Sequence, residues 1–351
     1  MRRRNGAQAR IARRSGRRRP LIGIARTAVV AAALACAPAA AAPAADAPAR
    51  PARVVTSIGD RAQLDRLVLV GEAGEIYTPA PGGWARDAPG SIAEDVAGAV
   101  RAGDGTIVLI AGRAPLYVRD GRAWRAVALE ARGVARASTD TGLPIVAIGR
   151  TLYAFDGGAF RRIGRAPAGV AALWAGSSAA VWLVDDAGAI ERGDGRRWTP
   201  VPGGFTPPET VARLVGWPGK PPYAIGDAGT ILALHADGAR PIARPDALAQ
   251  FEADAADATP RGTIVVAGRL PGGGALAVVE AGSLRRVADL PPLADGDRWS
   301  VVRASPDGGV LAVSYRGVVR LRGAGGAWQP RQIRTAAAEP VRAGPGPART
   351  R

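Results

Sequence analysis

Short apolar runs of about four to six residues recur from Val54 to Ile333, and glycine-rich turns separate them. Runs of this length, rich in Val, Ile and Leu, predict buried β-strands. Each run is followed by a turn that contains acidic residues and glycine, then by a second apolar run, a second glycine-containing turn and an aromatic residue. Leu67–Asp87 (LVLVGEAGEIYTPAPGGWARD) and Val181–Val201 (VWLVDDAGAIERGDGRRWTPV) both show this order. The pattern predicts an all-β chain.

The pattern occurs seven times with a period of roughly 40 residues, which is typical of a four-stranded β-propeller blade. A single blade has two bare faces, so it is stable only when neighbours cover them. The sequence therefore predicts a closed ring of seven four-stranded blades over residues 53–334, with six or eight blades as alternatives. The repeated aromatic or equivalent positions are Trp84, Trp124, Phe160, Trp198, Pro241, Leu284 and Trp328.

A further candidate strand precedes each copy, and we expect it to lie nearest the ring axis. No spare strand is evident for a swapped closure, so the first and last blades are expected to meet by face packing. Gln250–Ala255 is the poorest candidate. The seven inner-strand candidates are Arg53–Ile58, Val96–Arg101, Gly133–Ala137, Val170–Ala175, Val211–Trp217, Gln250–Ala255 and Trp299–Ala304.

The tryptophans fall into two groups by position. Those at the repeated position, one per blade and in register, are more typical of packing between blades than of sugar-stacking platforms. Trp217 and Trp299 stand outside that position and adjoin candidate inner strands. We expect these two to lie near a face or the channel, where a ligand would bind.

Charge is distributed unevenly. The chain has 47 Lys+Arg against 30 Asp+Glu, a formal net charge of +17. Ten arginines lie in residues 1–26, whereas residues 54–330 hold 30 basic and 28 acidic residues, a net of +2. A strongly basic chain suggests nucleic acid, but the predicted ring is almost neutral. We therefore expect no nucleic-acid partner.

The basic N-terminus has the order of an export signal. An arginine-rich region (1–26) precedes an apolar region (27–37) and a small-residue region (38–45). We expect a cleaved signal and a periplasmic, outer-envelope or secreted protein; a membrane anchor and a plain basic tail are the alternatives. Arg18-Arg19 resembles a twin-arginine signal, and Cys36 ends a degenerate lipoprotein box, which makes it a candidate for lipidation. Residues 46–52 are a predicted linker, and 335–351 a predicted disordered tail.

Catalytic and metal chemistry have few candidates. The single cysteine, Cys36, excludes a disulfide framework and a cysteine zinc site, and the single histidine, His235, excludes a histidine-rich metal site. Each acidic turn offers one or two carboxylates, too few for Ca²⁺. No spacing singles out arginines and tyrosines for a glycosidase site. We expect no catalytic residue, no metal and no cofactor.

Two blades share the motif Asp-Gly-x-x-Trp-x-x-Val, at Asp120–Val127 and Asp194–Val201, and Gly226–Ile231 (GDAGTI) carries the preceding turn. These motifs resemble the blades of photosystem II assembly-factor propellers and of the wider bacterial neuraminidase-repeat (BNR-like) family, among WD40-like and YVTN-like propellers. The resemblance implies a β-propeller that binds or helps assemble another protein. Val181–Gly204 is also similar to the blades of tectonin-like lectins.

These features together favour an exported, non-enzymatic, monomeric ring that binds or stabilises an envelope protein or complex. A carbohydrate-binding propeller is the first alternative, and a glycan hydrolase or lyase the second. Contact with a membrane is expected only through an uncleaved signal or a lipid on Cys36.

Overall fold

The computed structural model describes residues 52–337, apart from 89–91, 93–94, 102–105, 114–115, 121–122, 128, 139–143, 157–158 and 178–179. The chain divides into two units, Met1–Ala47 and Pro48–Arg351, and every described residue belongs to the second. The predicted signal, the linker up to residue 51 and Cys36 therefore lie outside the described residues. Within the described part, no helix is long and apolar enough to cross a membrane.

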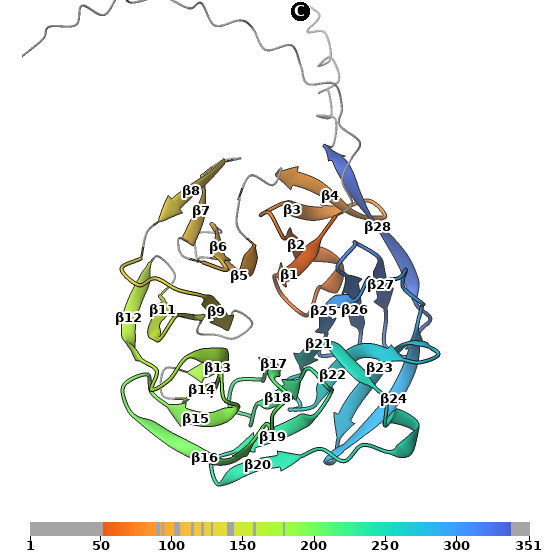
Figure 1. Cartoon of the computed structure of the whole chain (residues 1–351). Coiled ribbons are helices and arrows are strands. Elements are labelled where there is room, and N and C mark those ends of the chain that lie inside the picture. The colour runs from red at the N-terminus through yellow and green to blue at the C-terminus, as the bar shows by residue number, and fades with distance from the viewer. Residues whose placement is uncertain are drawn as a thin grey trace, which may run out of the picture. The chain divides into compact units, whose positions relative to one another are not determined.

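The second unit is a seven-bladed β-propeller, which confirms the predicted fold (Figure 1). Its strands form five four-stranded sheets and one eight-stranded sheet, and the larger sheet is blades 1 and 7 joined edge to edge. Within each blade the strands pair antiparallel in chain order. The innermost strands β1, β5, β9, β13, β17, β21 and β25 surround the axis.

In the part of the chain that the structure describes, the first four blades contain sixteen strands and one short 3-10 helix. Their bounds are β1 (Val54–Ile58), η1 (Leu64–Arg66), β2 (Val68–Gly71), β3 (Ile76–Ala80) and β4 (Gly83–Ala88); β5 (Val96–Arg101), β6 (Ile107–Ala111), β7 (Leu116–Asp120) and β8 (Ala123–Val127); β9 (Ala135–Ser138), β10 (Ile145–Ile148), β11 (Thr151–Phe155) and β12 (Phe160–Arg165); and β13 (Val170–Ser177), β14 (Ala180–Asp185), β15 (Ala189–Gly193) and β16 (Trp198–Gly204).

The last three blades contain twelve strands and a second 3-10 helix. Their bounds are β17 (Val211–Val215), β18 (Tyr223–Gly226), β19 (Ile231–His235), β20 (Gly238–Pro241) and η2 (Asp246–Leu248); β21 (Glu252–Ala258), β22 (Ile264–Leu270), β23 (Gly273–Glu280) and β24 (Ser283–Leu290); and β25 (Trp299–Ala304), β26 (Val310–Ser314), β27 (Val319–Arg322) and β28 (Gln329–Ala337).

The second strand of each blade is the most deeply buried. All residues of β6 and β26 are buried, because each of these strands has a neighbouring blade on both faces. Such strands are continuous apolar runs instead of alternating ones, which explains why they were evident in the sequence. The innermost strand β21 has the sequence EADAADA and begins two residues after the predicted start. Its small and acidic residues make no apolar run, so its position was the hardest to predict.

Seven hydrophobic clusters lie between consecutive blades, and the repeated aromatic positions belong to them. Trp84 is 1% exposed between blades 7 and 1, and its indole N–H donates to the Leu67 carbonyl at 2.6 Å. Trp124 donates to the Gly74 carbonyl of blade 1 at 3.2 Å, so it links two blades by a hydrogen bond as well as by packing. The other aromatic members are Phe160, Trp198 and Trp328.

Neighbouring blades are also joined at their outer strands. The C-terminal half of one outer strand lies against the last hairpin of the next blade. The Arg165 amide donates to the Gly195 carbonyl at 3.0 Å, and the Ala243 amide donates to the Gly282 carbonyl at 2.9 Å. The junction therefore recurs around the ring.

Ring closure extends this same junction. The outer strand of blade 7, β28, pairs parallel with β4 of blade 1, including Gln332 opposite Gly83. Gly83 has φ +156°, and a Cβ there would lie 2.1 Å from the Gln332 carbonyl oxygen, so glycine is needed for the approach. The expectation of closure by face packing alone was incomplete, since backbone hydrogen bonds also join the two blades. The strand runs to Ala337, three residues beyond the predicted end of the ring.

Blades 1 and 7 are further joined by a polar contact around Tyr315. The Tyr315 hydroxyl donates to Glu72 Oε1 at 2.6 Å, and Arg53 donates to Glu72 Oε2 at 3.0 Å. The Val54 amide donates to the Tyr315 carbonyl at 2.9 Å. Burial of Glu72 opposes its ionisation, but the hydrogen bonds from Tyr315 and Arg53 outweigh it and lower its pKa. The ionised form of Glu72 therefore stabilises the closed ring.

We expect Glu72→Gln to lower the free energy of unfolding at pH 7 by about 1 kcal/mol, because Glu72 and Arg53 are partly exposed and screened. A carboxyl group with a lowered pKa stabilises the fold at neutral pH and loses that contribution as pH falls below its ordinary value of 4.5. The difference between wild type and variant in urea unfolding should therefore shrink in acid. Glu280→Gln removes an exposed pair with Arg285 and is the control. A constant difference from pH 7 to acid would contradict this role for Glu72.

Candidate functional site: the central channel

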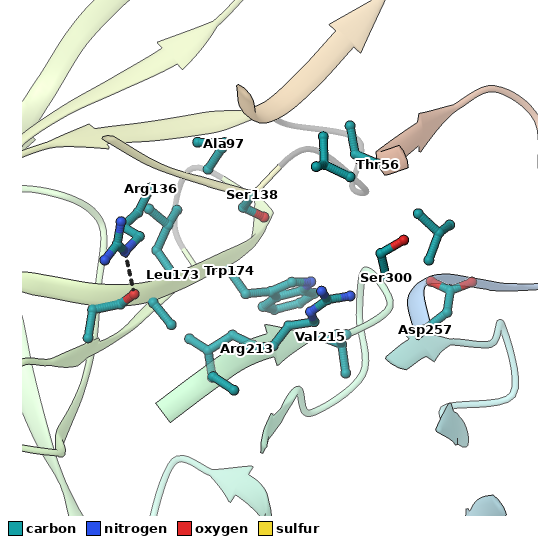
Figure 2. A pocket seen from close by; sticks show the side chains of 18 of the residues that line it. Thr56, Ala97, Arg136, Ser138, Leu173, Trp174, Arg213, Val215, Asp257 and Ser300 are labelled. Atoms are coloured by element: carbon teal, nitrogen blue, oxygen red, sulfur yellow. Dashed lines mark hydrogen bonds between the residues drawn. The ribbon is translucent and has the colours of Figure 1, made fainter. Parts of the chain in front are cut away.

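The seven innermost strands enclose a central cavity of about 300 Å³ (Figure 2). Every blade contributes at least one residue to its wall. Much of that wall is small, because alanine recurs on the inner strands. Small side chains leave the space at the axis open instead of filling it. The alanines of the wall are Ala97, Ala135, Ala137, Ala171, Ala172 and Ala212.

The charged residues of the described wall are four arginines and one aspartate. Arg136 lies near the start of β9, and its Nε donates to the Ala171 carbonyl of blade 4 at 2.8 Å. Arg213 lies in the middle of β17. Arg61 and Arg303 both contact the single acid, Asp257. The described lining therefore carries a net charge of +3, which favours an anionic or acidic ligand.

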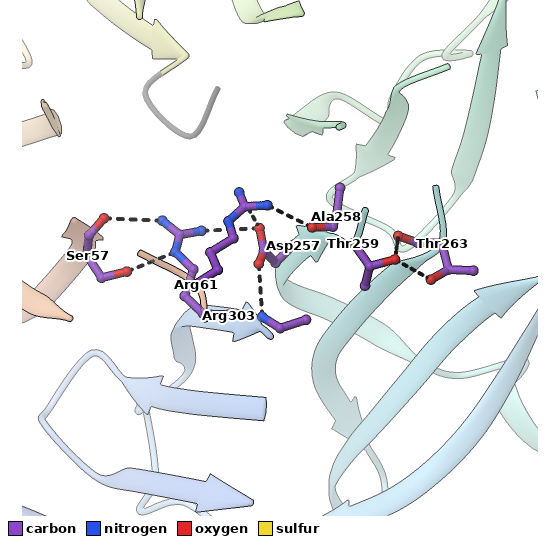
Figure 3. A network of polar contacts seen from close by, with 8 residues as sticks. Ser57, Arg61, Asp257, Ala258, Thr259, Thr263 and Arg303 are labelled. Carbon is purple, nitrogen blue, oxygen red and sulfur yellow. Dashed lines mark hydrogen bonds and ion pairs between the residues drawn. The ribbon is translucent and has the colours of Figure 1, made fainter. Parts of the chain in front are cut away.

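Asp257 is the centre of a buried ion network (Figure 3). It is 2% exposed, and its Oδ1 lies 2.8 Å from Arg61 and 3.6 Å from Arg303. Its Oδ2 accepts a hydrogen bond from the Ala304 amide at 2.9 Å. Arg303 also donates to Ser57 Oγ at 2.9 Å. A buried carboxylate needs this many donors, since desolvation penalises an unpaired charge.

Arg61 links blades that do not adjoin. It belongs to the segment after β1 in blade 1, yet it donates to the Ala258 carbonyl of blade 6 at 2.8 Å. Its guanidinium group also lies 5.0 Å from the ring centroid of Trp217, which follows β17 of blade 5. These partners all lie where the inner strands end. Arg61 therefore covers part of that end of the channel.

A second cavity, of about 530 Å³, adjoins the channel between blades 2 and 3. It shares Ala97 and Arg136 with the central cavity, so the two cavities adjoin along these residues. Val134 lines it and is 51% exposed, the one large hydrophobic side chain so exposed in the described part of the chain. This second cavity, termed the groove, is thus lined by an exposed apolar side chain, two arginines (Arg113 and Arg136) and one acid, Asp95.

The two tryptophans expected near a binding face differ in position. Trp217 is half-buried beneath Arg61, close to the channel end. Trp299 is 0% exposed within the core between blades 6 and 7. The expectation for Trp299 was wrong, because the start of β25 turns this side chain into the packed face of the blade. Trp174, 3% exposed, is the tryptophan that lines the channel.

Sequence reasoning missed the ion network altogether. Arg303 and Ser57 are 246 positions apart, and Arg61 and Ala258 are 197 apart, so no local motif connects them. The one available sequence signal of this network was an acidic residue, Asp257, within the innermost strand β21, where a hydrophobic residue is expected. Asp257 has no role in a hairpin turn, and a buried acid implies buried bases.

The arrangement has little of what hydrolytic chemistry requires. Glycoside hydrolysis generally uses two carboxyl groups flanking the bond, whereas the described channel wall offers Asp257 alone, already ion-paired with two arginines. His235 lies at the end of β19, the third strand of blade 5, and does not line the channel. Among the described residues, no group of three or more His, Cys, Asp and Glu side chains is placed to hold a metal ion.

No protein-family model matches the chain, and no curated protein matches it in sequence. Solved structures with the propeller fold do match the chain. YCF48 from Cyanidioschyzon merolae is 12% identical (TM-score 0.57), covering 77% of this chain and 95% of that one. YCF48 bound to D1 peptide is 15% identical (TM-score 0.54), covering 83% and 95%. A streptogramin B lyase is 11% identical (TM-score 0.59), covering 79% and 95%. At these identities the likeness establishes the propeller fold, as the sequence motifs implied.

We expect Asp257→Ala to destabilise the ring by about 3–5 kcal/mol, because it leaves two largely buried guanidinium groups without their carboxylate. Asp237→Ala removes an exposed partner of Arg240 and should cost less than about 0.5 kcal/mol. Chemical denaturation of both variants measures the difference. Equal, small effects would show that the network at the channel end contributes little to stability.

Proposed function

We propose that this protein is a non-enzymatic scaffold that binds an extended, acidic segment of a partner protein in the channel and its adjoining groove. The observation that carries the proposal is the pair of adjoining cavities, one lined by Val134 and the other at the axis, which share Ala97 and Arg136. Their walls are small and their described charged groups are mostly arginines. A slim, negatively charged chain fits both properties.

The chemistry of the channel supports binding more than turnover. Its one described acid is held by Arg61 and Arg303, so it is not positioned as a free general acid or base. The repeated tryptophans lie between blades, which removes them as sugar-stacking platforms. One structure of similar fold, YCF48, is described with a bound D1 peptide. Peptide binding is therefore a use to which this fold is put.

The proposed place of action is the cell envelope. The order of the first 45 residues, arginine-rich, then apolar, then small, supports export. The partner would then be an envelope protein or complex whose assembly or stability depends on the ring.

Photo-crosslinking tests the binding role. With a photoreactive amino acid in place of Val134, we expect a specific crosslinked partner in cells, and the crosslink should weaken at least about fivefold when Arg136→Gln is added. The same amino acid in place of Arg240, on the outer strand of blade 5, is the control. Equal labelling from both positions, or turnover of a substrate by the purified protein without any partner, would contradict the proposal.

Export has a separate test. We express the full-length chain in a bacterial host and fractionate the cells. We expect to find the protein outside the cytoplasm, with an intact mass that lacks the signal. An intact mass equal to that of a chain that begins at Cys36 and carries acyl chains would identify a lipoprotein. A full-length mass in the cytoplasm would contradict export.

A further inference from the structure

The indole N–H of Trp174 is a buried hydrogen-bond donor that no described residue satisfies. The indoles of Trp84, Trp124 and Trp198 each donate to a backbone carbonyl. Trp174 is 3% exposed, yet its Nε1–H has no partner among the described residues. A buried donor without an acceptor opposes folding, so each one in a native structure needs an explanation.

The position of Trp174 distinguishes it from the other unpartnered indoles. Trp299 and Trp328 also have an Nε1–H without a partner among the described residues. Both belong to the core between blades 6 and 7, and neither lines the central cavity. Trp174 does line that cavity, and Figure 2 shows its indole projecting from β13 toward it. A ligand in the cavity could therefore supply the missing acceptor.

Two glycines fix the position of the Trp174 ring. A Cβ on Gly216, just after β17, would lie 2.6 Å from Trp174 Cε2. A Cβ on Gly176, in β13, would lie 2.6 Å from Trp174 Cη2. Larger residues at either place would displace the indole. Because packing sets the orientation of the ring, the direction of its N–H is determined before any ligand arrives.

The wall beside Trp174 is cationic. The Nε of Arg136 donates at 2.8 Å to the carbonyl of Ala171, which precedes Trp174 by three residues in β13. Its other described acceptor is the carbonyl of Ala135, so neither contact balances its charge with a carboxylate. Arg213, in the inner strand of the adjoining blade 5, lines the same cavity. An acceptor that carries negative charge is therefore favoured at this wall.

We propose that the indole N–H of Trp174 recognises a carboxylate of the acidic segment bound in the central cavity. The inference rests on the proposed function, and it assigns the residue that selects the ligand. A carboxylate accepts several hydrogen bonds, and a hydrogen bond to a charged acceptor is stronger than one to a neutral acceptor. A neutral amide could accept from the indole but would gain nothing from the charge of Arg136 and Arg213. Trp174 should therefore distinguish an acid from its amide.

The spacing along β13 indicates where the carboxylate lies in the bound segment. Strand residues rise about 3.3 Å each, so Ala171 and Trp174 are roughly 10 Å apart along the strand. Arg136, held at Ala171, is shared by the groove and the central cavity. A segment that contacts Val134 and Arg136 in the groove thus needs about three further extended residues to place its carboxylate at Trp174.

Titration of the full-length, isotopically labelled chain with short peptides tests the proposal. The probe is a pentapeptide with one aspartate among four alanines, capped at both ends so that the side chain is its only carboxylate. The matched peptide has asparagine instead. The wild type should bind the aspartate peptide about tenfold more tightly, because its acceptor is charged. In NMR spectra, the indole signal that disappears in Trp174→Phe should shift when the wild type is titrated.

Trp174→Phe keeps an aromatic ring and removes the N–H. It should bind the aspartate peptide at least about tenfold more weakly and lose most of the preference over asparagine. A merely structural role would weaken both peptides alike, so the ratio of the two affinities is the informative readout. The matched control, Trp299→Phe, removes an unpartnered N–H that does not line the cavity and should keep the ratio. Thermal unfolding checks that both variants are folded.

A third peptide, of five alanines with a free terminal carboxylate, identifies the source of the group. Binding as tight as that of the aspartate peptide would assign the carboxylate to a chain end, and weaker binding would assign it to an acidic side chain. Equal binding of the aspartate and asparagine peptides by the wild type would overturn the inference, even if Trp174→Phe does not fold. So would no binding of the aspartate peptide, or an unchanged ratio in Trp174→Phe.

The proposed function is judged separately, by the crosslink at Val134. A specific partner crosslinked there, without any preference for the aspartate peptide, would keep the proposed function and overturn the role of Trp174. No crosslinked partner, with the preference for the aspartate peptide intact, would contradict the proposed function alone.

Discussion

The burial of each blade's two faces against its neighbours is the interaction on which this molecule depends. A four-stranded sheet of alanine, valine and leucine cannot hide both faces alone, so no blade is stable without the two beside it. The ring must therefore close. Its closure combines an apolar core around Trp84, the parallel pairing of β28 with β4, and the contact of Tyr315 with Glu72. The channel exists only because these contacts hold the seven inner strands in a circle.

The sequence predicted the parts of the fold that are local and repeated. Apolar runs such as β6, acid-glycine turns and an aromatic every forty residues each depend on neighbours a few positions away, so they leave a periodic trace. Contacts that occur only once in the ring leave no periodic trace in the sequence. Arg61 and Asp257 are nearly two hundred positions apart, and the extension of β28 onto β4 has no signature beyond an ordinary outer strand. Trp299 was misplaced because adjoining an inner strand does not decide which face a side chain enters.

Arginine has three distinct settings in this ring, although residues 54–330 carry a net charge of only +2. Arg303 is buried and satisfied by Asp257 and Ser57, where it contributes to architecture. Arg136 lies at the groove, where it donates to the Ala171 carbonyl of the neighbouring blade and to the Ala135 carbonyl of its own strand. Arg196 is exposed on the outer wall, where its backbone amide donates to the Asp194 carboxylate. Net charge describes none of these. What differs is the number of described acceptors that surround each guanidinium group.

The ion network also has a consequence for the order of assembly. Its members come from blade 1, blade 6 and blade 7, which are the beginning and the end of the ring along the chain. A growing chain exposes Arg61 long before Asp257 and Arg303 exist. The guanidinium group can remain in water during that interval, and it becomes buried only when the final blades arrive. Synthesis must therefore be nearly complete before the channel end can form, so a chain truncated after six blades would lack a closed ring, and Asp257 would lose Arg303 as a partner.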